Sequence, residues 1–305
     1  MSDAPFRSGF VSLIGRPNAG KSTLLNKLVG QKVAIVADKP QTTRTSIQGV
    51  VTLPGAQIVF LDTPGIHKAD SPLNKRLMAA VRASIDQRDL LLFVADATQT
   101  FGPEDRKAID LARRPGAPVA LVLNKIDLVK EKARLLPLIE HYKQAYDFVD
   151  YLPVSAMKGR GLDELRQAII SRLPEGPAYF PEDHVTDQPE RFLAAELIRE
   201  KVLQATRQEV PHSVTVTVDK WEETPTLTRI YASIRVERPG QKAIVIGAKG
   251  ATLKQIGTLA RQEMEKLLQV KIYLDLHVRV EPKWREKTGF LDALDWRTMA
   301  GKDDS

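Results

Sequence analysis

The sequence feature that most constrains the fold is the run from residue 15 to residue 22. It reads Gly-Arg-Pro-Asn-Ala-Gly-Lys-Ser and fits the pattern G-x-x-x-x-G-K-[S/T]. Residues 10–14 are apolar, as in a buried strand, and residues 23–29 have helical character. A strand, a glycine-rich loop and a helix in this order are typical of a phosphate-binding loop, because the glycines let successive backbone N–H groups face phosphate oxygens. The pattern therefore predicts an α/β domain that holds a nucleoside triphosphate.

The residues expected around the phosphates come from this loop and the start of the next helix: Gly15, Arg16, Pro17, Asn18, Ala19, Gly20, Lys21, Ser22 and Thr23. Lys21 should neutralise the β- and γ-phosphates, and the Ser22 hydroxyl should bind Mg²⁺. A threonine of the segment Gln41-Thr42-Thr43-Arg44 should reach the same metal, and Thr43 is favoured over Thr42.

The base is indicated by Asn124-Lys125-Ile126-Asp127, which follows the apolar residues 119–123. The Asp127 carboxylate can accept hydrogen bonds from N1–H and the 2-amino group of guanine. Adenine offers neither donor, so a site built on this carboxylate discriminates strongly. Main-chain N–H groups of Ser155 and Ala156 are expected to support the base. The N-K-x-D pattern alone is a weak signal, and a D-x-x-G turn alone is another. Together with the phosphate-binding loop, in this order and each at the end of an apolar strand, they predict GTP binding.

A further element on the phosphate side is Asp62-Thr63-Pro64-Gly65-Ile66, after the apolar residues 58–61. Asp62 is expected to hold Mg²⁺, and the Gly65 N–H to bond the γ-phosphate. Many GTPases place a glutamine directly after such a turn to orient the attacking water, which Ile66 cannot do. Slow hydrolysis without an activator is therefore expected, with Lys21, Asn18 and Thr43 as the catalytic candidates.

The spacing of the apolar runs predicts the architecture. Residues 10–14, 58–61, 90–95 and 119–123 are apolar without alternation, as in strands buried on both faces. Helical stretches, such as residues 72–83, 104–113 and 161–173, separate or follow them. This alternation predicts a mostly parallel sheet with helices on both faces, over residues 1–175.

Residues 174–181 read Pro-Glu-Gly-Pro-Ala-Tyr-Phe-Pro, through which no helix can continue. We therefore expect a linker at residues 176–189, a smaller α+β domain at residues 190–282 and a C-terminal tail at residues 283–305. The periodicity of the second domain predicts the element order α-β-β-α-α-β.

Gly247-Ala248-Lys249-Gly250 lies between the last two predicted helices. A G-x-x-G loop lets the backbone approach a nucleic-acid backbone, and Lys249 would meet a phosphate. In this element order the segment resembles a KH domain of the type II arrangement. The alternative is a helix–turn–helix corner in which the glycines serve only as caps. The residues assigned to RNA binding are Arg235, Lys242, Ile246, Gly247, Ala248, Lys249, Gly250, Lys254, Trp284 and Arg285.

The tail places Trp284, Phe290 and Trp296 among basic residues. Aromatic rings in such a setting are typical of surfaces that stack on bases. The same rings can instead pack the tail onto the second domain, and the sequence leaves both interpretations open.

Charge and cysteine content limit the remaining possibilities. The net charge is +7, but the whole excess lies in residues 1–181, and residues 182–305 are neutral. Only the local excess of basic residues between 229 and 254 supports RNA binding. The chain has no cysteine, which excludes disulfides, and it lacks a long apolar run and a signal-peptide layout. A cytoplasmic monomer is expected.

Together, these motifs resemble the Era family of bacterial GTPases, which belong to the translation-factor class and carry a C-terminal KH domain. The resemblance covers most of the chain. It implies GTP and GDP as ligands, binding to 16S ribosomal RNA near its 3′ end, a role in 30S subunit assembly, and loose peripheral association with the cell membrane. Asn18 matches the asparagine that coordinates K⁺ in related GTPases, so K⁺ is expected beside Mg²⁺. The alternative role for Asn18 is a local turn hydrogen bond.

Residues 33–48 and 65–73 flank the predicted γ-phosphate position and should order with GTP and loosen with GDP. The main competing function is a GTPase whose C-terminal domain binds a protein or a membrane surface. The G-x-x-G loop and the basic stretch around it favour RNA, and Asp127 disfavours an ATP-using kinase.

Overall fold

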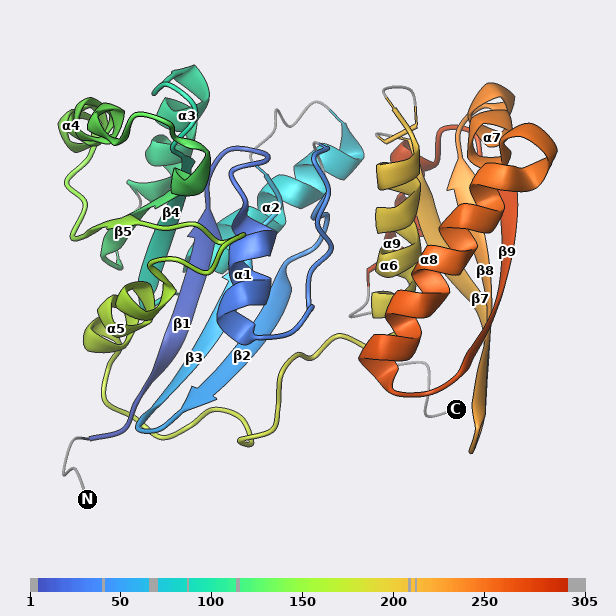
Figure 1. The fold of residues 1–305 in the computed structure, drawn as a ribbon, viewed down its shortest axis with the longest axis horizontal. Coiled ribbons are helices and arrows are strands. Elements are labelled where there is room, and N and C mark those ends of the chain that lie inside the picture. Colours follow the sequence, from blue (N-terminus) through green and yellow to red (C-terminus); the bar gives the residue numbers. More distant parts are fainter. Residues whose placement is uncertain are drawn as a thin grey trace. The chain divides into compact units, whose positions relative to one another are not determined.

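The computed structural model describes residues 5–39, 42–65, 71–86, 88–113, 116–207, 210–211 and 213–295. The chain forms two compact units, both drawn in Figure 1. The first unit comprises Met1–Ala34, Thr43–Lys68 and Arg76–Asp187, and the second comprises Ile35–Thr42, Ala69–Lys75 and Gln188–Ser305.

The first unit is built on a six-stranded sheet with the order β2-β3-β1-β4-β5-β6. Its strands are β1 (Arg7–Ile14), β2 (Ile47–Leu53), β3 (Ala56–Asp62), β4 (Leu90–Asp96), β5 (Val119–Asn124) and β6 (Tyr151–Pro153). The pairs β1–β3, β1–β4, β4–β5 and β5–β6 are parallel, and β2–β3 is antiparallel. The prediction of a mostly parallel sheet is confirmed. Strand β2 was not predicted, and it begins within the segment expected to respond to nucleotide.

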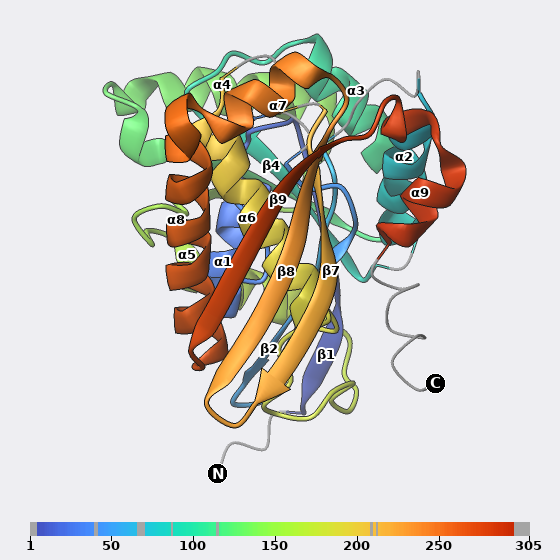
Figure 2. The same ribbon diagram turned by 90° about the vertical axis from the view of Figure 1, so that its right-hand side faces the viewer.

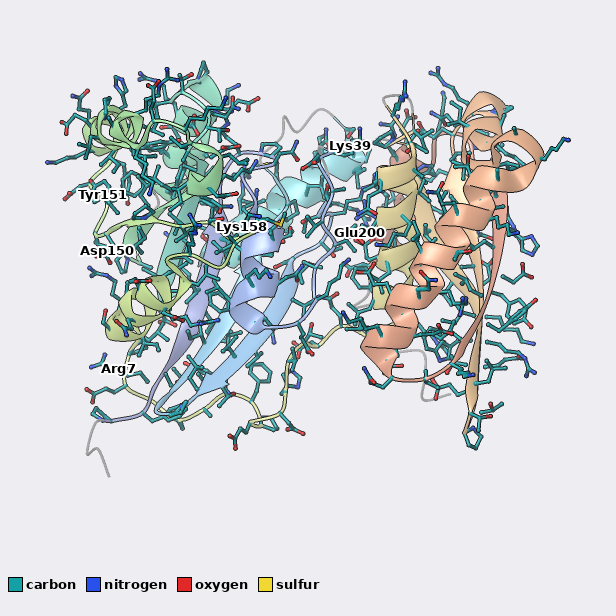
Figure 3. All side chains as sticks on the ribbon, viewed as in Figure 1. Arg7, Lys39, Asp150, Tyr151, Lys158 and Glu200 are labelled. Atoms are coloured by element: carbon teal, nitrogen blue, oxygen red, sulfur yellow. The ribbon has the colours of Figure 1, made fainter. Side chains whose placement is uncertain are left out.

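The α-helices that accompany this sheet in the described residues are α1 (Lys21–Val29), α2 (Pro72–Asp86), α3 (Pro103–Ala112), α4 (Leu135–Ala145) and α5 (Leu162–Arg172). Side chains of α2, α3 and α4 share one apolar core with β4 and β5. Helices α1 and α5 cover the opposite face, as Figure 1 shows. Arg7, labelled in Figure 3, donates from Nη1 to the carbonyl of Leu173 at 2.7 Å and so ties the end of α5 to the start of β1. No helix within the described residues is long and apolar enough to span a membrane.

The predicted motifs all follow strands of this sheet. The glycine-rich loop follows β1, Asp62 ends β3, Asn124 ends β5, and Ser155 comes shortly after β6. Because these strands are parallel, their carboxyl ends meet at one edge of the sheet. The fold therefore brings the nucleotide motifs to a single edge.

Most of the predicted linker packs against the first unit. The Gln57 side chain donates to the carbonyl of Phe180 at 2.8 Å and accepts from the N–H groups of Tyr179 and Phe180 at 2.7 and 3.0 Å. The Val50 N–H donates to the carbonyl of Val185 at 2.8 Å. Residues 176–187, here called the linker strap, therefore belong with the first unit, and the division between the units falls after Asp187, inside the predicted linker.

The second unit contains a three-stranded sheet with the order β7-β8-β9. Its elements are α6 (Glu190–Ala205), β7 (Thr215–Thr224), β8 (Leu227–Val236), α7 (Pro239–Ile246), α8 (Ala251–Leu268) and β9 (Ile272–Val280). Strands β7 and β8 are antiparallel, and β8 and β9 are parallel. Figure 2 shows α6 behind these strands and α8 beside β9, and side chains of both helices share an apolar core with those of β8. The predicted order α-β-β-α-α-β is confirmed.

After β9 the chain forms a 3₁₀ turn, η4 (Trp284–Glu286), and a short helix, α9 (Thr288–Ala293). Trp296 lies outside the described residues.

Candidate functional site

The phosphate loop is held by the asparagine of the predicted base motif. Gly20 adopts a φ of 92°, and a Cβ there would lie 2.3 Å from Nδ2 of Asn124. The same Nδ2 donates to the carbonyl of Ala19 at 2.9 Å, and Oδ1 of Asn124 accepts from the Ala156 N–H at 3.0 Å. Asn124 thus joins three of the four predicted motifs, and glycine at position 20 leaves room for this contact.

Lys21 is buried at the centre of the loop. Its Nζ donates to the carbonyls of Gly15 and Arg16 at 3.2 and 3.0 Å. Burial lowers the pKa of Lys21 to about 8, and the nearby Asp62 carboxylate offsets part of this effect. Within the described residues the Lys21 ammonium donates only to these two carbonyl groups, and a buried cation bound in this way is suited to receive phosphate.

Three oxygen-bearing side chains meet beside Lys21. The Ser22 hydroxyl lies 2.9 Å from Thr43 Oγ1 and donates to Asp62 Oδ2 at 2.7 Å. Thr43 Oγ1 lies 3.3 Å from the same carboxylate oxygen, whereas the Thr42 hydroxyl donates to the carbonyls of Lys39 and Ala37. The geometry therefore favours Thr43 over Thr42 as the metal-side threonine.

The Asp62 carboxylate provides a test of whether this cluster suits Mg²⁺. Asp62 is fully buried, and among the described residues its Oδ1 has no hydrogen-bond partner. Burial raises the pKa of Asp62, although Lys21, the two hydroxyls and the Thr63 N–H oppose this rise. A buried carboxylate oxygen without a donor, next to two hydroxyl oxygens, matches the hard oxygen ligands that Mg²⁺ prefers.

The side chains of Arg16, Pro17 and Asn18 in the phosphate loop have different surroundings. The guanidinium of Arg16 pairs with Asp105 at 2.9 Å, so only its backbone faces the phosphate side. Burial alone would lower the pKa of Arg16, but the hydrogen bond and charge of Asp105, together with Glu104, raise it. Asn18 adopts a φ of 62° and its side chain is exposed; its carbonyl accepts from Lys125 Nζ at 2.7 Å. Pro17 lies between them, next to Gly65, where a Cβ would be 3.1 Å from Pro17 Cγ.

The base side is formed by two short segments. Asp127 lies in the 3₁₀ turn η1 (Ile126–Leu128), and its half-buried carboxylate forms no hydrogen bond or ion pair with the part of the chain that the structure describes. The backbone of Ser155 pairs with that of Arg160, and its hydroxyl accepts from the N–H of Lys158, which Figure 3 labels. Asp127 is therefore available to a ligand, and the Ser155–Ala156 segment is folded.

The remaining phosphate-side predictions have mixed outcomes. The Thr63 hydroxyl donates to the carbonyl of Leu13 at 2.6 Å, so this side chain braces the turn rather than facing the site. Pro64 and Gly65 are described, and Thr23 is half-buried in α1. Gln41 and Ile66 lie outside the described residues.

The G-x-x-G loop of the second unit projects between α7 and α8. Gly247 adopts a φ of 72°, and a Cβ there would lie 2.2 Å from Thr252 Oγ1. Ala248 and Lys249 are exposed, and Gly250 ends the 3₁₀ turn η3 (Ala248–Gly250) that leads into α8. The backbone and the Lys249 ammonium are therefore accessible to a phosphate.

A groove of about 400 Å³ runs from this loop along α8 and the edge strand β9. Leu274 and Leu276 give it an apolar side, and the other lining residues come from Gly250 and α8. The lining residues are Gly250, Leu253, Lys254, Gly257, Thr258, Arg261, Leu274 and Leu276. Of these, sequence reasoning named only Gly250 and Lys254. The α8 residues recur at helical spacing from Gly250, and this periodicity is the signal that identifies the others.

Several residues assigned to RNA binding lie away from this groove, among them Arg235 and Trp284. Arg235 lies on the sheet face opposite the helices, where Nε donates to Thr217 Oγ1 at 3.2 Å and the guanidinium lies 5.4 Å from the Phe290 ring centroid. Trp284 is 0% exposed, and its Nε1–H donates to the carbonyl of Ser213 at 2.8 Å. Trp284 therefore packs the tail onto the domain, and its ring is not accessible for base stacking.

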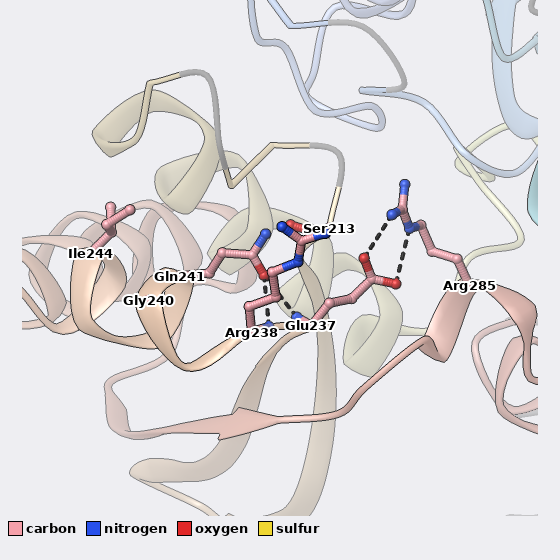
Figure 4. Close-up of a pocket in the computed structure, with 7 residues that line it drawn as sticks. All are labelled: Ser213, Glu237, Arg238, Gly240, Gln241, Ile244 and Arg285. Atoms are coloured by element: carbon pink, nitrogen blue, oxygen red, sulfur yellow. Dashed lines mark hydrogen bonds and ion pairs between the residues drawn. The ribbon is translucent and has the colours of Figure 1, made fainter.

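Arg285 borders a second pocket of about 500 Å³, shown in Figure 4. Its guanidinium forms a two-point pair with Glu237, at 2.6 and 3.1 Å. Arg238 also lines this pocket. On α7, Lys242 is half-buried, and Ile246 packs partly into the apolar core. Arg285 thus has an acidic partner, whereas Lys249 and Lys254 are exposed and have none within the part of the chain that the structure describes.

Comparison with known proteins agrees with this geometry. Residues 10–125 match the family model described as a 50S ribosome-binding GTPase, and residues 209–285 match the KH domain model. The curated protein GTPase Era of Geobacter metallireducens is 52% identical over 296 residues, which cover 96% of this chain and 99% of that protein. GTPase Era of Rippkaea orientalis is 50% identical over 286 residues, which cover 93% and 90% of the two chains.

Two solved structures resemble the whole chain. An Era variant of Aquifex aeolicus bound to GDP·AlF4⁻ and an Era complex with MgGDPNP and nucleotides 1506–1542 of 16S ribosomal RNA each match with a TM-score of 0.92. Each is 40% identical and covers 95% of this chain and 99% of its own. Identity of about half over nearly the full length, together with both domain matches, shows that the chain belongs to the Era family of GTPases.

Proposed function

We propose that the protein is a GTP-hydrolysing switch that binds single-stranded RNA near the 3′ end of 16S ribosomal RNA and assists assembly of the 30S subunit. The observation that carries this proposal is the groove that continues from the accessible G-x-x-G loop, on a chain whose other unit gathers the guanine-nucleotide motifs. The 40% identical Era complex with MgGDPNP and 16S ribosomal RNA supports it.

In the proposed nucleotide site, Ser22, Thr43 and Asp62 hold Mg²⁺, which when bound neutralises charge on the phosphates. Lys21 binds the phosphates from the other side, and the loop N–H groups orient them. Asp127 selects guanine. Ile66 follows Gly65 and has no hydrogen-bonding side chain to orient water, so hydrolysis without an activator is slow.

Asn18 is the proposed ligand for K⁺. Its side chain is exposed beside the loop, and a monovalent cation there would offset charge that develops during hydrolysis. Turnover measured in K⁺ and in Na⁺, for the wild type and for Asn18→Ala, tests this role. Faster turnover in K⁺ that disappears in Asn18→Ala is expected. Equal wild-type rates in the two salts would remove K⁺ from the mechanism.

The proposed RNA site consists of the G-x-x-G loop and the α8–β9 groove. Filter binding of a single-stranded RNA with the 16S 3′-terminal sequence tests it with Lys249→Glu. The matched control is Lys266→Glu, an exposed lysine in the last turn of α8 that does not line the groove. We expect Lys249→Glu to weaken binding about tenfold or more and the control to change it little. Equal loss in both variants would indicate only non-specific charge attraction.

The competing function, a C-terminal domain that binds a protein or a membrane surface, is an outcome of the same assay. If wild-type protein shows no RNA affinity above that of a basic control protein, that function becomes the better account.

We further propose a cytoplasmic monomer with loose peripheral membrane association. Light scattering during size exclusion tests the monomer, and flotation with anionic and neutral vesicles tests the association.

A further inference from the structure

A buried carboxylate behind the phosphate loop has no assigned role. Asp105 lies in the first turn of α3 and is 1% exposed. It does not belong to any of the motifs expected to touch the nucleotide. Asp105 nevertheless contacts the phosphate loop directly, because it pairs with the loop residue Arg16.

Three donors from three different segments meet at this carboxylate. Oδ2 accepts from Arg16 Nη1 at 2.9 Å and from the Gly102 N–H at 2.9 Å. Oδ1 accepts from the Tyr142 hydroxyl of α4 at 2.9 Å. Both oxygens are therefore satisfied, and a buried carboxylate held in this way is a fixed point in the fold.

The contact extends to the centre of the phosphate loop. The Arg16 guanidinium is anchored at Asp105, and the carbonyl of Arg16 accepts from Lys21 Nζ at 3.0 Å. Tyr142, Asp105, Arg16 and Lys21 thus form a continuous series of contacts from α4 to the ammonium of the loop. Movement of Arg16 would shift a carbonyl that positions Lys21.

A helix cap alone does not require this arrangement. Asp105 does accept from the Gly102 N–H at the start of α3, which is an ordinary capping contact. Capping contacts need neither a half-buried arginine from another segment nor a tyrosine from another helix.

We propose that Asp105 is a positioning residue for the phosphate loop, which it holds through Arg16 so that nucleotide release stays slow. This role rests on the proposed nucleotide site. Asp105 does not touch the nucleotide, so it acts on the affinity for GDP and GTP alike and leaves the preference for guanine unchanged.

The test is the dissociation rate of a fluorescent GDP analogue, N-methylanthraniloyl-GDP, from the full chain with Mg²⁺ present. Asp105→Asn keeps the side-chain shape but turns a donor or a neutral oxygen toward Arg16. Release should accelerate about tenfold or more, because a hydrogen bond between charged partners is lost. Asp110→Asn, on the exposed side of the same helix, should change the rate less than about twofold.

A double-mutant cycle separates positioning from simple stability. If Asp105 acts through Arg16, then Asp105→Asn combined with Arg16→Met releases the analogue no faster than the faster single variant. Additive acceleration, or a lower melting temperature with an unchanged release rate, overturns the proposal. Should Asp105→Asn fail to fold, Arg16→Met and Tyr142→Phe take its place, and unchanged release in both overturns it equally.

The wild type distinguishes this proposal from the one on which it rests. If folded wild-type protein binds none of the analogue, the proposed nucleotide site itself is wrong. If the wild type binds it and Lys21→Ala does not, but Asp105→Asn leaves release unchanged, only the positioning role fails.

Discussion

At the scale of single residues, the nucleotide site depends on charged side chains that are buried. Burial of such groups is unfavourable until a ligand of opposite charge binds. Lys21 and Asp62 are both buried. Burial lowers the pKa of Lys21 and raises the pKa of Asp62, and both shifts favour the neutral form. Sequence motifs identified both residues, because the motif defines the residue type at each position. The motifs could not show that Arg16 faces Asp105 or that Trp284 is buried, because those outcomes depend on partners far away in the sequence.

Asp127→Asn should change the preferred base from guanine to xanthine. The amide can donate to an oxygen at purine position 2, which xanthine has, and it loses the charge that pairs with guanine. We expect GTP affinity to fall at least about a hundredfold and xanthosine triphosphate to bind instead. Calorimetric titration with both nucleotides measures this. The control is Asp163→Asn, a surface aspartate in α5 that is 85% exposed. Unchanged preference in Asp127→Asn would contradict the base assignment.

The lowered pKa of Lys21 predicts a pH effect. Its folded-state pKa of about 8 lies below the ordinary value of 10.5, so the unfolded chain binds more protons between these values and stability rises with pH through that window. Phosphate favours the charged lysine and should raise its pKa again. Binding of GDP at pH 8.5 should therefore take up roughly half a proton or more, and binding at pH 7 little.

Calorimetry in two buffers with different heats of ionisation measures this proton uptake. No uptake at pH 8.5 would contradict the environment that the structure gives to Lys21.

At the scale of elements, sequence periodicity predicted most helices and strands to within a few residues. It missed β2 because Ile47–Leu53 reads as IQGVVTL, an edge strand with a glycine and few alternating residues. The division between the two units falls inside the predicted linker, near its end. The prolines at 174, 177 and 181 do end the helix, but the strap is ordered by hydrogen bonds to Gln57 and Val50, which local sequence does not reveal.

One substitution in the groove along α8 should have opposite effects on stability and on RNA affinity. Gly257 lies within the helix and lines the groove, and a Cβ there would meet Leu276 Cδ1 at 3.4 Å, an ordinary contact. Gly257→Ala should stabilise the second unit by about 0.5–1 kcal/mol, because alanine favours the helix. It should also narrow the groove and weaken RNA binding several-fold. Thermal unfolding and filter binding measure the two effects, and a stabilised variant with unchanged RNA affinity would remove the groove from the RNA site.

Gln57 should be the anchor of the linker strap. Gln57→Ala removes a buried amide that makes contacts to Tyr179 and Phe180, and it leaves their backbone groups without partners. We expect a loss of about 2–3 kcal/mol in unfolding free energy and faster hydrogen exchange in residues 179–186. Gln144→Ala, on the exposed side of α4, is the control and should change neither. Unaltered exchange in the strap of Gln57→Ala would show that other contacts hold it.

At the scale of the whole molecule, the two units differ in their net charge and in their expected ligands. The positive excess lies in the nucleotide half, so we expect RNA affinity to come from local features such as Lys249, Lys254 and the groove rather than from net charge. Ile35–Thr42, within the segment expected to respond to nucleotide, groups with the second unit, while Thr43 groups with the first. Nucleotide binding at Thr43 is therefore expected to bias the RNA-binding unit, as a coupling between two sites.

The most direct test of this account is the affinity of the full-length wild type for single-stranded RNA with the 16S 3′-terminal sequence, measured with Mg²⁺ and either GDP or a non-hydrolysable GTP analogue. The account predicts tighter RNA binding, by at least about fivefold, with the GTP analogue. Equal RNA affinities in the two nucleotide states would contradict it.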